Sequence, residues 1–272
     1  DAANGSIPTD FSSWGPLANL TIKPEISAPG GNIMSTVDPA VGGDGQNYAN
    51  YSGTSMATPN ISGCIALVRQ YVNDKFPDLT MQQKTEMVNT LLMCTANPVV
   101  DDKGVEYGVR RQGAGMANVI GAISTQAYLS TDSNIRPKLE IGDDADRTGV
   151  YTLNFKVTNF GDKALTYTID PSMTTADYEW IDQGDRATNV IKPNNMDVTG
   201  MMTFTSNYAD NKVTVAPGET KPIEVVMTVN DDFRKLCDEV FKFGAYVEGY
   251  CYLRAEADAE GAVGTDLSIC YL

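Results

Sequence analysis

The chain has 272 residues, of which 42% are hydrophobic and 20% are charged, and this supplies enough apolar material for two globular domains with separate cores. Its formal net charge of −15 argues against nucleic acid or an anionic membrane surface as a partner, and no apolar run is long enough to span a membrane. Histidine is absent, so a mechanism that needs a histidine base must take it from another segment or another chain.

The cysteines are odd in number and show no CxxC spacing, which argues against a zinc site and against a disulfide framework. We expect them to behave as small buried hydrophobic residues; they are Cys64, Cys94, Cys237, Cys251 and Cys270.

Helical periodicity dominates up to about residue 127. A first helix is predicted to start near Ser55 and to stop before Pro77, with an apolar face made by Ile61, Cys64, Ile65, Val68, Tyr71 and Val72. Thr80, followed by Gln83 three residues later, forms a capping-box pattern that predicts the start of a second helix. The inner face of this second helix is expected to be Met87, Val88, Leu91 and Leu92, and a short third helix is expected after Gly115.

Alternation of apolar and polar residues dominates the remainder and predicts half-buried antiparallel strands. The apolar sets are Tyr151, Leu153, Phe155 and Val157; Leu165, Tyr167 and Ile169; Val213 and Val215; Ile223, Val225, Met227 and Val229; a run from Ala245 to Arg254; and Leu267, Ile269 and Tyr271. Strands at this density, with few helical patterns between them, indicate a two-sheet sandwich. The polar segment 171–211 fits poorly and is interpreted as a long insertion with one strand near Met202–Thr205.

The sequence therefore predicts an α/β unit over residues 1–127, followed by an all-β antiparallel sandwich over residues 128–272. The first unit has 11 acidic and 7 basic residues, a net charge of −4, and the second has 24 and 13, a net charge of −11. Most of the acidity is thus expected on the sandwich.

The motif that indicates chemistry is GTSMATP at residues 53–59. It places Ser55 at the start of a helix, where backbone N–H groups have no helical partners and the helix dipole is positive, so an attacking serine oxygen lies beside donors for an oxyanion. Gly53 permits close approach, and Thr54 is a candidate cap for the helix. A lone GTS is more often only a helix cap.

Four blocks in order outweigh that simpler interpretation. GTSMATP resembles the nucleophile signature of the subtilase family, FSSWGP at 11–16 resembles its FSS-x-G block, KPEISAPG at 23–30 resembles its KPD-[IV]-x-APG segment, and RQGAG at 111–115 with Asn118 resembles its Q-G-x-G-x-x-N block. Asn118 itself is better explained by a polar contact in a helix than by catalysis. Asn60 stands where many subtilases carry a histidine that is not the triad histidine, and this places the chain near the cell-envelope, lactocepin-like branch.

The resemblance implies a partial subtilisin-like parallel sheet with helices over 1–127 and a fibronectin type III-like sandwich over 128–272. It implies a serine endopeptidase with Ser55 as nucleophile, supported by Gly53 and Thr54, acting on polypeptides outside a bacterial cell or attached to its wall. In subtilisin the triad order is Asp, His, Ser, so the aspartate, the histidine and the oxyanion amide are expected upstream, in the remainder of the catalytic domain. The isolated chain is expected to be inactive.

Acidic residues offer weaker signals. Asp10, Asp38 and Asp44 lie in the wrong order for a triad and are interpreted as loop and turn residues. No cofactor is identified; calcium is an alternative for two carboxylate clusters without EF-hand spacing, for which a solvated acidic loop is the simpler interpretation. These clusters are Asp143, Asp144 and Asp146, and Asp177, Glu179, Asp182 and Asp185. Tyr246, Tyr250 and Tyr252 are expected to cover a neighbouring sheet or domain rather than to bind a partner.

Two functions remain open at this point. The first is an extracellular subtilisin-like endopeptidase that uses Ser55. The second is a non-catalytic adhesion or substrate-docking module built on a pseudoprotease scaffold, which the missing base and the sandwich would also suit.

Overall fold

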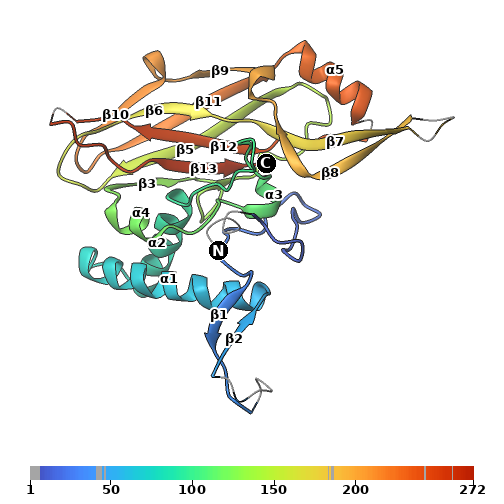
Figure 1. Cartoon of the computed structure of the whole chain (residues 1–272). Helices are drawn as coiled ribbons and strands as arrows, with labels where there is room; N and C mark the ends of the chain where they lie inside the picture. Colours follow the sequence, from blue (N-terminus) through green and yellow to red (C-terminus); the bar gives the residue numbers. More distant parts are fainter. Residues whose placement is uncertain are drawn as a thin grey trace.

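The structure is a computed structural model that describes residues 7–40, 45, 47–182, 184, 187–241, 243–258 and 260–272. A layer of helices packs beneath a β-sandwich, and two β-hairpins project from the molecule (Figure 1). The α/β class of the first part and the sandwich of the second are as the sequence predicts.

The helical layer consists of α1 (Thr54–Lys75), α2 (Met81–Cys94), α3 (Val109–Gln112) and α4 (Val119–Ser124). The capping box of α2 is confirmed, because Gln83 N–H donates to Thr80 Oγ1 and Thr80 N–H donates to Gln83 Oε1 at 2.9 Å. α1 ends before Pro77, also as expected. The core between α1, α2 and α4 is made by Val68, Val72, Val88, Leu91, Leu92 and Ala122.

The strands of the first part are fewer than a subtilisin-like sheet would have. β1 (Ile33–Thr36) and β2 (Tyr48–Tyr51) form an antiparallel hairpin that projects away from the helices (Figure 1). Within the described residues of this part, parallel pairing is limited to one bridge between Ser27 and Met116. Residues 25–28 and 114–117 supply this single parallel pair.

The sandwich is built from two sheets. One has the order β10 (Lys212–Val215), β6 (Leu165–Pro171), β12 (Gly249–Ala255), β13 (Leu267–Tyr271), β4 (Lys138–Leu139), and the other has the order β3 (Ala127–Ser130), β5 (Val150–Asn159), β11 (Thr220–Val229), β9 (Met202–Ser206). All pairs are antiparallel except β4 with β13. The alternating sets predicted from the sequence point into one core, which includes Leu153, Phe155, Tyr167, Ile169, Val225, Met227, Leu253 and Ile269.

The five-stranded sheet is covered on both faces. Cys251 and Leu253 of β12 face the sandwich core, while Tyr250 and Tyr252 pack in a second cluster with Ile22, Met93, Val109 and Ala114 from the helical part. Packing of Tyr250 and Tyr252 against a neighbouring domain was the expectation and is confirmed, whereas Tyr246 is 39% exposed. One expectation is wrong: β13 is buried at all five positions rather than on one face, because the helical layer covers its second face.

The segment 171–211 is also corrected. The strand near Met202 is present as β9, but the segment also contains the long hairpin of β7 (Thr174–Asp182) and β8 (Ala187–Asp197). Described residues of both strands, Trp180, Ile181, Val190 and Ile191, are exposed although they are apolar, so the sequence does not show the alternation of a half-buried strand. α5 (Asp231–Val240) was not expected either; Asn230 caps it by accepting from Asp232 N–H and Phe233 N–H, both at 3.1 Å.

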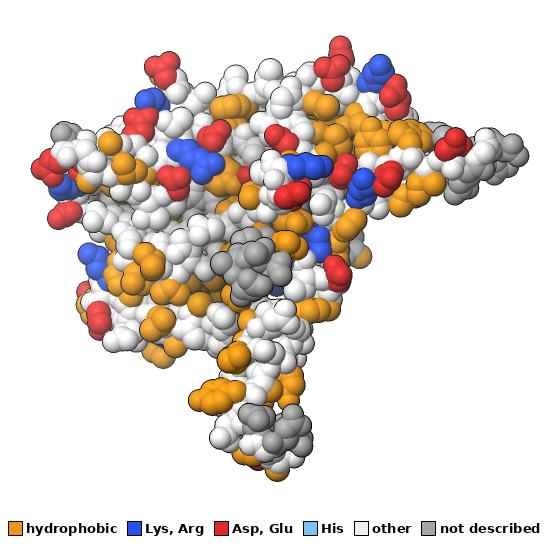
Figure 2. Space-filling model, viewed as in Figure 1, with side chains coloured by type: hydrophobic (Ala, Val, Ile, Leu, Met, Phe, Trp, Pro, Cys, Tyr) orange, Lys and Arg blue, Asp and Glu red, His pale blue; other side chains and the backbone are white. Residues whose placement is uncertain are grey.

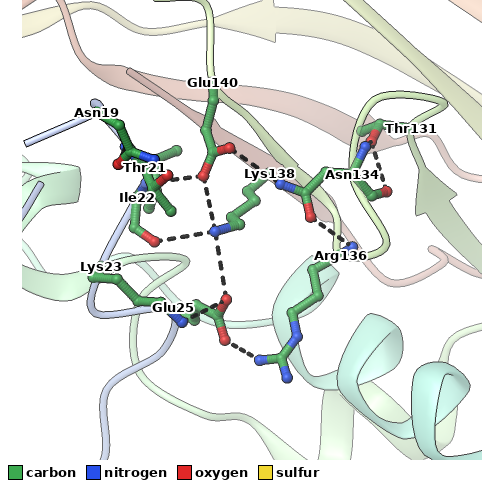
Figure 3. Close-up of polar contacts among 10 residues, drawn as sticks. All are labelled: Asn19, Thr21, Ile22, Lys23, Glu25, Thr131, Asn134, Arg136, Lys138 and Glu140. Carbon is green, nitrogen blue, oxygen red and sulfur yellow. Dashed lines mark hydrogen bonds and ion pairs between the residues drawn. The ribbon is translucent and has the colours of Figure 1, made fainter. Parts of the chain in front are cut away.

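An ion cluster around the buried Lys138 joins the two parts (Figure 3). The Lys138 side chain is 4% exposed, and its ammonium lies 2.9 Å from Glu140 and 3.4 Å from Glu25 and donates to Ile22 O at 3.1 Å. Arg136 donates to the second oxygen of Glu25. Since burying one ammonium is costly without partners, this arrangement ties the segment around Glu25 firmly to the segment that enters the sandwich.

The remaining global features are simple. The five cysteines are free, and Cys94, Cys251 and Cys270 are buried as expected, while Cys64 and Cys237 are half-buried. No helix in the described part of the chain has the length and hydropathy that crossing a membrane requires.

Candidate active site

Ser55 lies in the first turn of α1 and is exposed. Within the described residues its hydroxyl has no hydrogen-bond partner, so the oxygen is free for an incoming group. The helix is capped by Gly53 without a side-chain bond, and not by Thr54 as the sequence suggested; the Thr54 carbonyl instead accepts from Thr58 Oγ1 at 2.9 Å. The start of the helix therefore carries no side chain that competes with Ser55.

The backbone at the start of α1 leaves a donor beside the serine. Met56 N–H and Ala57 N–H donate to Gly53 O at 3.0 and 3.3 Å, whereas Ser55 N–H has no partner in the part of the chain that the structure describes. An unpaired amide at a helix N-terminus favours negative charge. An oxyanion formed next to Ser55 Oγ could thus be held by this amide.

Gly30 sets where α1 begins. Its carbonyl accepts from Gly53 N–H at 2.8 Å, and its Cα lies so close to the helix that a Cβ there would stand 2.8 Å from Gly53 O and 3.1 Å from Ala57 Cβ. Nearby, Ser52 Oγ accepts from Asn32 N–H at 2.8 Å. The sequence singled out the KPEISAPG block only by resemblance; the structure gives its last glycine a steric role.

The RQGAG block is a structural element rather than a reacting one. Gln112 is fully buried and satisfies three backbone groups, accepting from Val99 N–H at 2.7 Å and donating to Val99 O at 3.1 Å and Tyr107 O at 2.6 Å. Gly113 has a φ of 60° and packs against the backbone of Pro24 and Glu25, where a Cβ would not fit. These contacts explain the glutamine and the first glycine of the motif.

Two of the motif blocks meet at Arg111. Its guanidinium lies 5.0 Å from the ring centre of Trp14 and 5.4 Å from that of Tyr107, and it donates to Pro8 O and Pro193 O. Asn118, by contrast, caps α4 by accepting from Gly121 N–H at 2.9 Å. Asn118 thus makes the polar helix contact that the sequence favoured.

The acidic candidates occupy loops. Asp10 is exposed, Asp38 accepts from Ala40 N–H within a turn, and Asp44 lies outside the described residues. Asp144 accepts from Thr148 N–H and Gly149 N–H, both at 2.8 Å, and Asp182 accepts from Gly184 N–H, while Asp185 is also outside the described residues. Across the described ranges no three His, Cys, Asp or Glu side chains group in a way that could hold a metal ion.

Figure 2 shows hydrophobic side chains on the surface of the β1–β2 hairpin and of the helical layer. The exposed apolar residues there include Met34 (69%), Tyr48 (63%) and Leu67 (58%), and only Val68 and Val72 of the 22 residues of α1 are buried. This is an unusual exposure for a helix that carries a motif of small and apolar residues.

These features define a class: an α/β unit that presents a serine at a helix start, fused to an antiparallel sandwich. Comparison with known proteins agrees. The family model described as the subtilase family matches residues 2–115, and a model described as an Fn3-like domain matches residues 141–272. The chain belongs to the subtilase family through its first part and carries an Fn3-like domain as its second.

Similar curated proteins cover almost all of the chain. It is 30% identical to the PI-type proteinase of Lactococcus lactis subsp. cremoris over 97% of this chain and 13% of that protein. It is 26% identical to the C5a peptidase of Streptococcus pyogenes serotype M1 over 95% of this chain and 20% of that protein. The chain therefore spans a small part of the length of these relatives.

Among solved structures, an ASH/PapD-like domain of human CEP192 matches 54% of this chain and 84% of its own, with 5% identity and a TM-score of 0.32. A likeness at that score carries no functional argument.

Proposed function

We propose that this chain is the C-terminal part of the catalytic domain, with the following Fn3-like domain, of a bacterial subtilisin-like serine endopeptidase that acts outside the cell or on its wall. Ser55 is the nucleophile. The observation that supports this best is the free hydroxyl and free N–H of an exposed serine at the start of α1, inside a subtilase-family segment.

The chemistry follows from that placement. A histidine supplied by the preceding segment takes the Ser55 hydroxyl proton while the oxygen attacks the scissile carbonyl of a polypeptide, and the oxyanion is held by Ser55 N–H together with a side-chain amide from the same segment. An aspartate there orients the histidine. Since the chain has no histidine, Ser55 alone is an unactivated alcohol and the isolated chain does not turn over peptides.

The partner of this chain is then the rest of its own catalytic domain. The exposed apolar residues of β1, β2 and the middle of α1 support this, because a surface of that kind is expected to be covered in the functional protein. The same surface would place the missing base beside Ser55.

The test is active-site labelling with a fluorophosphonate, applied to the chain joined to its preceding segment. Labelling is expected at Ser55, and Ser55→Ala is expected to abolish both labelling and cleavage of a protein substrate. Ser62→Ala is the matched control, because Ser62 is an exposed serine of the same helix whose hydroxyl donates to Thr58 O at 2.9 Å.

The isolated chain should not be labelled above the background of a surface serine. Labelling of another residue, or cleavage that survives Ser55→Ala, would refute the proposal. If the preceding segment lacks an aspartate and a histidine in subtilase-like contexts, the protein is a pseudoprotease, and the adhesion or docking function becomes the better account.

A further inference from the structure

We propose that the Fn3-like sandwich is a positioning element for the nucleophile: Tyr250, Glu248 and Lys138 hold two short segments of the first part, and these segments fix Gly30 against the start of α1. The three are positioning residues and touch no substrate. The catalytic consequence rests on the proposed function, whereas the mechanical coupling does not.

The first set of contacts from the sandwich holds α3. Glu248 precedes β12 and is 0% exposed; one carboxylate oxygen accepts from Arg110 N–H at 2.9 Å, and the other accepts from Arg110 Nε at 2.9 Å. Asn195 donates to the same carboxylate at 3.0 Å. Two residues further on, the Tyr250 hydroxyl donates to Gly113 O at 2.7 Å in a fully buried site. Arg110 of α3 and Gly113, which follows α3, are thereby attached to β12 and to the residue just before it.

The second set of contacts holds the segment 22–25. Lys138, buried at the beginning of β4, pairs with Glu25 and donates to Ile22 O, and Arg136 binds the other oxygen of Glu25 (Figure 3). Ile22 N–H in turn donates to Glu140 at 2.9 Å. The segment 22–25 is therefore fixed by side chains that belong to the second part of the chain.

The two held segments are paired with each other. Ala114 N–H donates to Glu25 O at 3.0 Å, Ser27 N–H donates to Gly115 O at 2.8 Å, and Ala117 N–H donates to Ser27 O at 2.9 Å. From this ladder the chain runs three residues to Gly30, whose carbonyl accepts from Gly53 N–H. Each step is a backbone bond or a buried side-chain bond, so a continuous set of contacts joins β12 to the first turn of α1.

These contacts bear on catalysis because they affect where the nucleophile is held. A nucleophile must be held within a fraction of an ångström of its working position, and the residues that hold it need support of their own. In the described residues the backbone of segment 25–28 pairs with 114–117, and 114–117 is also paired with Asn97 of the first part. The side chains that hold this ladder at Glu25 and at Gly113 come from the sandwich.

The test is hydrogen exchange of the Gly53, Met56 and Ala57 amides in the 272-residue chain. Tyr250→Phe removes only the hydroxyl that holds Gly113, and we expect these amides to exchange about fivefold faster, as loss of one buried hydrogen bond implies. Tyr271→Phe is the matched control, because it deletes an equally buried tyrosine hydroxyl that donates to Ser172 O at 2.6 Å within the second part. Exchange at residues 53–57 should be unchanged in Tyr271→Phe.

A second variant, Lys138→Met, tests the other hold and should also accelerate exchange at Gly53. In the chain joined to its preceding segment, Tyr250→Phe should lower kcat while KM stays close to that of the wild type. Exchange at Gly53 that is the same in Tyr250→Phe, Lys138→Met and Tyr271→Phe would overturn the inference. Faster exchange without fluorophosphonate labelling of Ser55 in any variant would leave the coupling standing and refute the proposed function instead.

Discussion

The contact between Gly30 and the start of α1 allows a sharp test by Gly30→Ala. The added Cβ would lie 2.8 Å from Gly53 O, 3.1 Å from Ala57 Cβ and 3.4 Å from Ala57 N. None of these atoms is the end of a flexible side chain, so the helix start or the segment around Gly30 must move by roughly half an ångström to reach ordinary contact distances. Overpacking of this kind costs about 1–3 kcal/mol.

A smaller gain opposes that cost, because replacing glycine with alanine restricts the unfolded chain and stabilises by about 0.4–1 kcal/mol. The net expectation is a loss of about 1–2 kcal/mol, measured as a lower urea midpoint in circular dichroism. Gly31→Ala is the control, since its Cβ would meet only the Thr9 methyl at 3.2 Å, which can rotate away. An equal midpoint for the two variants would refute the steric argument and with it the view that Gly30 locates α1.

Three further predictions concern the interior and the exposed helix. Gln112→Leu should lower the free energy of unfolding, measured by calorimetry, by about 3 kcal/mol or more, because Val99 N–H, Val99 O and Tyr107 O lose their buried partner. The control is Gln70→Leu, which changes an exposed glutamine and should have no comparable effect. Burial raises the pKa of Glu106 above its ordinary 4.5, so between pH 4.5 and the raised pKa the folded chain keeps a proton that the unfolded chain has released. The contribution of Glu106 to the free energy of unfolding therefore falls as pH rises through this range. The melting temperature of the wild type relative to Glu106→Gln should therefore decline over that window, and a flat difference would contradict this. Gly63→Ala should stabilise the isolated chain against urea by about 0.5–1 kcal/mol, because the added Cβ meets no described atom within 4 Å and alanine is the better helix former. The gain should disappear when the preceding segment covers α1. Destabilisation of the isolated chain would contradict the prediction.

The helices and strands that the sequence predicted correctly are those in which buried residues recur at one regular spacing along the chain. The capping box at Thr80, the apolar face of α2 and the alternation in β5 and β11 are local patterns, and each is present in the structure. The β7–β8 hairpin was missed for the opposite reason. Trp180, Ile181 and Ile191 remain at least 41% exposed there, so neither face shows the apolar alternation of a half-buried strand.

The sequence by itself determined the family, the location of the serine motif and the two-part organisation. Ordered motifs and changes of periodicity depend only on the order of residues along the chain. Only the tertiary structure decided that Gly30 packs against the start of α1, that Gln112 binds Val99 and Tyr107, that Tyr250 binds Gly113, and that β13 is buried on both faces. Contacts between residues 30 and 53, or 113 and 250, join positions far apart in the sequence. The first joins two segments within the first part and the second joins the two parts, and both exist only once the chain has packed and excluded water, which no local pattern encodes.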